Sequence, residues 1–289
     1  MPLEPFVTPY VQRLGLALDD HRRPSAAGLK ELHRAHVERV PWETLEIHLG
    51  RPTTVDPHES MARILRGRGG YCFHLNGAFA TLLTALGYGV TWHRGGVHSD
   101  AGSQPPGATG GHLVLTVVCE GRTWVVDVGF GEALYEPVPL RAGSYRQGPF
   151  TYRLGPSAVE PGGWRFDNDE HGAFVGMDFT LAPAAPADFA EHHAVMSTSP
   201  DSQFVRTAAV VRRRKDGFDR LRGCTLTRVD GTGRARRELT TSDEWFGVLA
   251  GTFGITLADV DPAERAALWE KVRAGSTARQ ARRAGGGTT

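Results

Sequence analysis

The sequence predicts an α+β fold in three parts: an N-terminal helical bundle, a central antiparallel β-barrel-like domain and a C-terminal α/β lid. Apolar residues recur at helical spacing up to residue 88. Residues 89–195 instead contain short β-branched and aromatic runs separated by glycine and proline, a pattern typical of an antiparallel sheet. Further strand-like runs and two helix-like segments follow. The expected domains are 1–88, 89–195 and 196–275, with a disordered tail at 276–289.

The composition indicates an ordered globular protein of nearly neutral charge. Of 289 residues, 40% are hydrophobic and 9% aromatic, which is enough to bury a substantial core. A net charge of +1 gives no global field for nucleic acid, and no run reaches the length of a membrane span. Three cysteines without zinc-ligand spacing predict no metal site and fit a reducing compartment. Since the N-terminus also lacks a secretory pattern, we expect a cytoplasmic protein, monomeric or homodimeric, without nucleic-acid or membrane partners.

Three helices are predicted in the first part. Thr8 followed by proline predicts the start of a short helix, and Ser25 predicts the N-cap of a second. The third follows a glycine-rich loop at residues 68–71 and ends near Gly87. Cys72 therefore lies in or next to the first turn, where free N–H groups and the macrodipole favour a thiolate over a thiol. A lone cysteine is nevertheless more often a small buried hydrophobe, so further signals are needed.

A β-hairpin is predicted at residues 112–128. Two β-branched runs flank Glu120 and Gly121, which read as a two-residue turn. In that register His112 and Asp127 share one face of the hairpin as diagonal neighbours, which brings a carboxylate within reach of an imidazole. A slip of one residue would move Asp127 to the opposite face and remove the pairing.

The remaining elements are predicted from shorter patterns. Loops rich in glycine, proline or polar residues are expected at 99–110 and 143–148. Ser242 and Pro262 each predict the start of a C-terminal helix. Further candidate strands cover residues 90–92, 150–154, 164–166, 205–212, 223–228 and 235–239.

Together, Cys72, His112 and Asp127 supply the residue types of covalent acyl transfer: a nucleophile, a base and a group that orients the base. Each residue alone also has a purely structural reading, but the three together favour catalysis. A protease, a transglutaminase-like enzyme and an acyltransferase all fit these residue types. The order of cysteine on a helix, then histidine and aspartate on adjacent strands, suits the cysteine-protease and transglutaminase-like arrangement of a triad.

Several segments resemble the arylamine N-acetyltransferase family in matching order. The three signature-like segments are RGGYCFHLN at 68–76, GGHLVLTVV at 110–118 and WVVDVGFG at 124–131. Further matches are VPWETL at 40–45, IHLGRP at 47–52 and STSPDSQF at 197–204. The resemblance runs from about Tyr10 to about Val272, and these motifs are highly specific. It implies that Cys72, His112 and Asp127 form the catalytic triad.

The resemblance also assigns supporting roles near this triad. It implies that Glu43 pairs with Arg68 and so braces the loop that presents Cys72. It places Trp42 and Phe204 near the donor and acceptor cleft. One departure is His74 two residues after the cysteine, because the family more usually has glutamate there.

Phe130 is the residue that we expect against an aromatic acceptor. Its neighbours Gly129 and Gly131 are small enough to allow close approach, and its ring face suits stacking. A core phenylalanine at a strand end is the structural alternative. The backbone N–H of Cys72 is the candidate oxyanion donor.

The resemblance implies acetyl transfer from acetyl-CoA to an arylamine, arylhydrazine or arylhydroxylamine by a ping-pong mechanism through an acetyl-Cys72 thioester. Such a role belongs to xenobiotic metabolism, with acetyl-CoA as co-substrate and no permanently bound cofactor. The main alternative is an amide synthase that releases a polyketide chain from an acyl carrier protein onto an aryl amine. A cysteine hydrolase, in which water replaces the amine, and a non-catalytic binding protein are the remaining alternatives.

Overall fold

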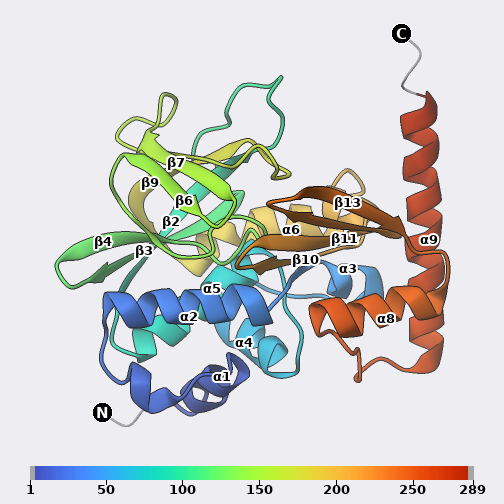
Figure 1. Ribbon diagram of the computed structural model, residues 1–289, viewed down its shortest axis with the longest axis horizontal. Coiled ribbons are helices and arrows are strands. Elements are labelled where there is room, and N and C mark those ends of the chain that lie inside the picture. The colour runs from blue at the N-terminus through green and yellow to red at the C-terminus, as the bar shows by residue number, and fades with distance from the viewer. Residues whose placement is uncertain (1–3, 286–289) are drawn as a thin grey trace.

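The structure is a computed structural model that describes residues 4–285, with side chains described up to residue 277. The N-terminal helices lie below the barrel strands in Figure 1, and α8 and α9 form the right-hand side. The α-helices are α1 (Val7–Arg13), α2 (Ala26–Arg39), α3 (Leu45–Leu49), α4 (Pro57–Leu65), α5 (Cys72–Ala85), α6 (Ala190–Thr198), α7 (Gln203–Arg206), α8 (Ser242–Phe253) and α9 (Pro262–Gly285). Two short 3-10 helices are η1 (Leu18–His21) and η2 (Pro186–Phe189).

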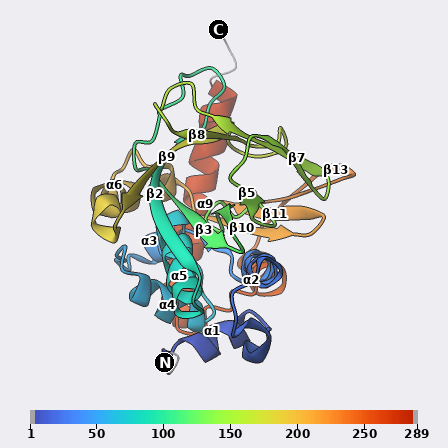
Figure 2. The same cartoon turned by 90° about the vertical axis from the view of Figure 1, so that its left-hand side faces the viewer.

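Helix α5 forms the centre of the N-terminal part. Most of its residues are apolar, and all residues from Cys72 to Ala80 are buried. It packs against α4, β2 and β3 (Figure 2). At its N-terminus the Tyr71 N–H donates to His74 Nδ1 at 3.2 Å. His74, the departure from the family pattern, therefore has a local capping role.

An eight-stranded antiparallel sheet, the barrel sheet, forms the central part. Its strand order is β5-β4-β3-β2-β9-β8-β7-β6. The two edge strands approach each other, since the Tyr145 hydroxyl on β6 donates to the Pro139 carbonyl on β5 at 3.3 Å. The predicted barrel-like sheet is therefore confirmed. Its strands are β2 (Gly89–His98), β3 (His112–Cys119), β4 (Arg122–Val126), β5 (Val138–Pro139), β6 (Gly143–Gln147), β7 (Phe150–Pro156), β8 (Trp164–Asp167) and β9 (Gly176–Ala184).

A second antiparallel sheet, the lid sheet, has the order β1-β10-β11-β12-β13. Strand β1 lies in the N-terminal part, yet it pairs with β10 through Trp42 opposite Val211. One sheet therefore joins the first and third of the expected domains, and the division into three domains stays a prediction. The strands are β1 (Trp42–Glu43), β10 (Ala209–Arg214), β11 (Gly217–Arg222), β12 (Thr225–Asp230) and β13 (Gly233–Glu238).

Two segments expected to lack regular structure are ordered. The expected loop at 143–148 contains strand β6, which pairs with β7 across a turn that Gly148 enters with φ of 64°. The expected disorder from residue 276 is replaced by α9, which continues to Gly285. Ser276 is buried there, and its hydroxyl accepts a hydrogen bond from the Cys224 N–H at 3.3 Å. The last part of the predicted tail, 286–289, lies outside the described residues.

Candidate active site

Cys72 is the first residue of α5 and is 5% exposed. The loop before it follows a path that only glycine permits. A Cβ on Gly69 would lie 1.8 Å from the Pro41 carbonyl oxygen, and Gly70 has a φ of 158°. The glycines that precede the cysteine therefore let the chain approach β1 closely enough to place the sulfur at the helix start.

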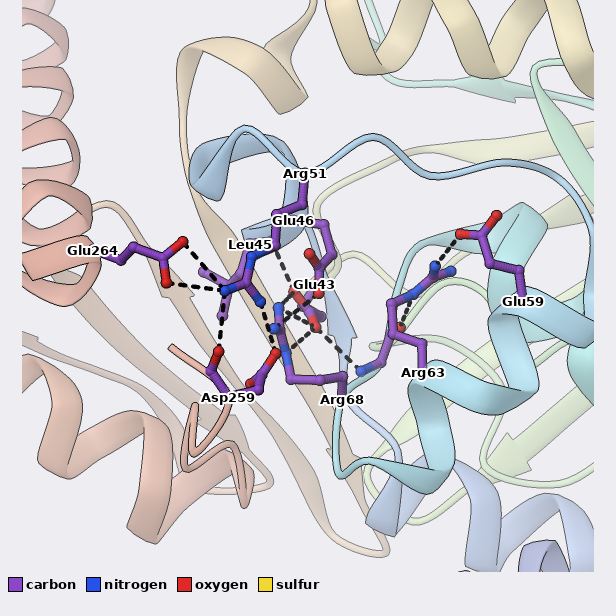
Figure 3. Close-up of polar contacts among 10 residues, drawn as sticks. Glu43, Leu45, Glu46, Arg51, Glu59, Arg63, Arg68, Asp259 and Glu264 are labelled. Atoms are coloured by element: carbon purple, nitrogen blue, oxygen red, sulfur yellow. Dashed lines mark hydrogen bonds and ion pairs between the residues drawn. The ribbon is translucent and has the colours of Figure 1, made fainter. Parts of the chain in front are cut away.

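Buried charges brace this loop (Figure 3). The Arg68 guanidinium donates to both carboxylate oxygens of Glu43, at 3.1 and 3.2 Å, and forms an ion pair with Glu46. Glu43 also accepts the Gly69 and Leu45 N–H groups at 3.1 and 2.8 Å. Burial alone would raise the pKa of Glu43, but Arg68 and these backbone donors lower it below the usual value. The pairing of Arg68 with Glu43 expected from the resemblance is present.

Two further arginines extend the charged network in Figure 3. Arg63 donates to the Gly69 carbonyl at 3.2 Å and to Glu59 at 2.7 Å. Arg51 donates to Asp259 at 2.7 Å and contacts Glu264 at the start of α9. Residues 51–63 thus bind both the loop before Cys72, through Arg63, and the start of α9, through Arg51.

The hairpin that carries the predicted base has the predicted register. Cys119 pairs with Arg122, and Leu115 pairs with Val126. His112 Nε2 lies 2.7 Å from Asp127 Oδ2, and each side chain is 2% exposed. The imidazole and the carboxylate therefore form the buried pair that the alternation of strand side chains predicts.

The His112 ring also contacts the cysteine. Nε2 is hydrogen-bonded to Asp127, and the ring also interacts with the Cys72 side chain. Because Asp127 holds Nε2, Nδ1 is the nitrogen left for the cysteine. Burial alone would lower the pKa of His112, but the charges of Asp127 and Cys72 and the hydrogen bonds to them raise it to about 10. The arrangement therefore favours a protonated His112 ring beside the Cys72 side chain.

Asn76, which the sequence did not single out, ties these groups together. It lies one helical turn after Cys72, and its Nδ2 donates to Asp127 Oδ1 at 2.9 Å and to the Leu113 carbonyl at 2.6 Å. Its Oδ1 accepts the Val128 N–H at 2.8 Å. A polar residue four positions after the cysteine, on the same helix face, was the available signal.

His33 on α2 is a second buried residue that the sequence did not single out. Its ring nitrogens lie 3.1 Å from the carbonyl oxygens of Asp127 and Tyr135. Burial lowers the pKa of His33 to about 4, so near neutral pH its single N–H serves one of these oxygens at a time. The ring therefore holds the backbone of Asp127 against the helical part.

Phe130 is fixed by its glycine neighbours and by ring stacking. A Cβ on Gly129 would lie 2.8 Å from Cys72 Cα, and a Cβ on Gly131 would lie 2.6 Å from Trp42 Cβ. Between them, the Phe130 ring stacks on His112 at 4.0 Å and on Phe174 at 4.3 Å. Phe130 therefore covers one face of the imidazole, and its contact with an aromatic acceptor stays a prediction.

A cavity of about 690 Å³ opens onto these groups. Its lining brings together six of the predicted site residues: Trp42, Cys72, His112, Gly129, Phe130 and Phe204. Trp42 and Phe204 meet edge to face at 5.3 Å. The remaining predicted site residues are not part of the lining: Asp127, Gly131, Arg68 and Glu43. The lid sheet contributes Val211, Arg220 and Arg222 to the same cavity.

Neither a metal-ligand cluster nor a membrane span is found in the described part of the chain. Residues 4–277, whose side chains are described, contain no group of three or more His, Cys, Asp or Glu side chains placed to hold a metal ion. Among the same residues, every helix is too short or too polar to cross a bilayer.

Comparison with known proteins places this chain among N-acetyltransferases. A family model described as N-acetyltransferase matches residues 26–261. Human arylamine N-acetyltransferase 1 is 27% identical over 276 residues, which cover 86% of this chain and 93% of that protein. The crystal structure of the Nocardia farcinica arylamine N-acetyltransferase is 33% identical, with a TM-score of 0.80 over 91% of this chain and 93% of that one. The Mycobacterium marinum arylamine N-acetyltransferase in complex with CoA is 26% identical, with a TM-score of 0.81 over 92% and 98%.

Proposed function

Since the chain belongs to the arylamine N-acetyltransferase family, we propose that it transfers an acetyl group from acetyl-CoA to an arylamine, arylhydrazine or arylhydroxylamine. The observation that carries the proposal is the continuous contact from Cys72 through His112 to Asp127 at the cavity wall. Cys72 is the proposed nucleophile, His112 the general acid and base, and Asp127 the group that orients the imidazole.

The first half-reaction forms the acetyl-enzyme. The Cys72 thiolate attacks the thioester carbonyl, and a tetrahedral intermediate forms. The bond to the CoA sulfur then breaks, and the His112 imidazolium protonates the departing CoA thiolate. Donor and acetyl-Cys72 are both thioesters, so little energy separates them. The Cys72 N–H at the start of α5 is the proposed oxyanion donor.

The second half-reaction transfers the acetyl group to the amine. The amine nitrogen attacks the acetyl carbonyl of Cys72, neutral His112 accepts a proton from this nitrogen, and the Cys72 thiolate leaves. The enzyme returns to its thiolate–imidazolium state. Asp127 accepts a hydrogen bond from the Nε2–H throughout, which leaves Nδ1 as the nitrogen that exchanges a proton with the reacting groups.

The choice of donor rests on relatives. The structure of the Mycobacterium marinum relative contains CoA, and the two chains overlap over most of their length. We propose acetyl-CoA as the co-substrate, without a permanently bound cofactor. Trp42 and Phe204, which form an aromatic corner of the cavity, are proposed to contact donor or acceptor.

Two-substrate kinetics test this function. With acetyl-CoA and an arylamine such as aniline both varied, we expect parallel double-reciprocal lines, because CoA leaves before the amine reacts. A donor panel is run with the same amine. Intersecting lines would contradict the acetyl-enzyme route. If turnover occurs only with acyl chains on a carrier protein, the protein is an amide synthase and acetyl-CoA is not its donor.

A further inference from the structure

Arg220 on β11 stands in the wall of the cavity that contains Cys72. The register of the lid sheet places it opposite Val211, which in turn lies opposite Trp42, so the three side chains share one face of the sheet. A Cβ on Gly131 would lie 3.0 Å from Val211 Cβ, and Gly129 touches Cys72. Adjacent strands are about 4.8 Å apart. The Arg220 backbone therefore lies about that distance from Val211, which packs next to the Gly129–Gly131 segment beside Cys72.

The Arg220 guanidinium is only partly used within the fold. Its Nη1 donates to Glu132 Oε2 at 3.0 Å, and its side chain is 17% exposed. Within residues 4–277, whose side chains are described, this is its one hydrogen bond, although a guanidinium carries five N–H donors. Arg220 therefore keeps donors for a ligand.

Glu132, in contrast, has no free oxygen to offer. It is 6% exposed, and its other oxygen, Oε1, accepts the N–H of Ala173. Ala173 precedes Phe174, whose ring stacks on Phe130. Glu132 thus holds Arg220 on one side and the aromatic wall on the other, and so fixes the distance between the cation and the rings.

The free guanidinium donors on the cavity wall favour an anionic ligand. Glu132 is the one carboxylate among the described lining residues, and its two oxygens already accept from Arg220 and from the Ala173 N–H. The apolar part of this wall, which includes Trp42, Phe174 and Phe204, suits an aromatic ring, and the unused N–H donors of Arg220 suit an anionic substituent on that ring.

We propose that Arg220 is a specificity-determining residue that binds the carboxylate of an arylamine acceptor such as an aminobenzoate. The inference rests on the proposed function, because it takes an arylamine to be the group that enters this cavity. The phosphates of CoA are the other source of anionic groups in the reaction, and the experiment separates the two.

The test compares Arg220→Met with wild type on para-aminobenzoate and on the uncharged para-aminobenzamide. We expect KM for the benzoate to rise about tenfold or more, because a hydrogen-bonded ion pair is lost, while kcat/KM for the benzamide stays within about twofold. Acetylation of Cys72 by acetyl-CoA without amine should keep its rate. Equal changes for both acceptors, or a raised KM for acetyl-CoA with unchanged acceptor preference, would overturn the proposal.

Two variants guard against a general effect on folding. Arg228→Met is the matched control, because Arg228 on β12 also pairs with a buried carboxylate, Asp219 at 3.0 Å, but does not line the cavity. It should leave the acceptor preference unchanged. Glu132→Gln keeps an oxygen for the Ala173 N–H but removes the competing charge, so KM for the benzoate should fall severalfold. A damaged fold would not produce that gain.

The outcomes distinguish this inference from the proposed function. If wild-type Cys72 takes up no acetyl group, the proposed function fails. If Cys72 is acetylated and the benzamide is turned over, but Arg220→Met treats both acceptors as wild type does, only the role of Arg220 fails.

Discussion

The two walls of the cavity differ in how completely their polar groups are partnered. On the wall formed by α5 and the β3–β4 hairpin, Asp127 accepts from Asn76, Gly129 and His112, and every residue of the set is buried. On the lid wall, Arg220 makes one hydrogen bond and keeps a partly exposed guanidinium.

This difference separates chemistry from specificity. Groups that exchange a proton need one fixed geometry, which a saturated hydrogen-bond network provides. Groups that select a substrate need free donors that the substrate completes. We therefore expect substitutions on the first wall to change the rate with every acceptor, and substitutions on the lid wall to change the rate with some acceptors only.

The largest effect is expected for Asp127→Asn. An asparagine here can keep its oxygen for the Asn76 and Gly129 donors, but its NH2 group then faces His112 Nε2 and forces the other tautomer. We expect kcat/KM to fall about 10⁴-fold with every acceptor and the thermal midpoint to stay close to that of wild type. Near-normal turnover would mean that the wall formed by α5 and the β3–β4 hairpin does not carry the chemistry.

The pH dependence of His112 tests the same wall without a substitution. Its pKa is raised to about 10, so the protonated ring stabilises the fold fully below pH 6.5, and this stability is lost as the pH rises through about 10. NMR titration of the ring should show no deprotonation between about pH 6 and 9. A midpoint near 6.5 would mean that Asp127 and Cys72 do not hold the proton.

Arg68→Met tests the support behind the cysteine loop. Removing the guanidinium leaves Glu43 buried without its partner, so we expect a loss of about 3–5 kcal/mol in the free energy of unfolding, measured with urea. The matched control is Arg51→Met, because Arg51 is 30% exposed and its partners Asp259 and Glu264 are 38% and 41% exposed. That variant should lose about 1 kcal/mol or less. Equal losses would show that burial does not decide the strength of these pairs.

Asn76→Ala should give the smallest of these effects on the reacting wall. It removes one of the donors to Asp127 but leaves Gly129 and His112 in place, so we expect kcat/KM to fall about 10- to 100-fold. Thr81→Ala is the control on the same helix, because its hydroxyl donates only to the Gly77 carbonyl at 3.0 Å. An equal loss in both variants would point to damage of α5 instead.

The sequence predicted the parts of the site that follow from local periodicity. The helix start at Cys72 and the hairpin register that pairs His112 with Asp127 depend on neighbours in the chain, and their patterns are regular. The family resemblance added the pair of Glu43 with Arg68, which no spacing rule would supply.

Contacts between distant segments could not be read from the sequence. Asn76 and His33 look like ordinary helix residues until the hairpin packs on α5 and α2. Strand β11 places Asp219 and Arg220 next to each other, which breaks the alternation typical of a strand, and it was not predicted. The role proposed for Arg220 becomes visible only when β11 pairs with β10 beside the cavity. Such features depend on tertiary pairing, which propensity and period do not encode.

The most direct test of the account is intact-protein mass spectrometry after incubation with acetyl-CoA and no amine. We expect wild type to gain the mass of one acetyl group, peptide mapping to place it on Cys72, and later addition of an arylamine to remove it. Cys72→Ala should gain nothing, although Cys119 and Cys224 remain. Absence of the adduct in wild type, or its presence on Cys119 or Cys224, would contradict the account.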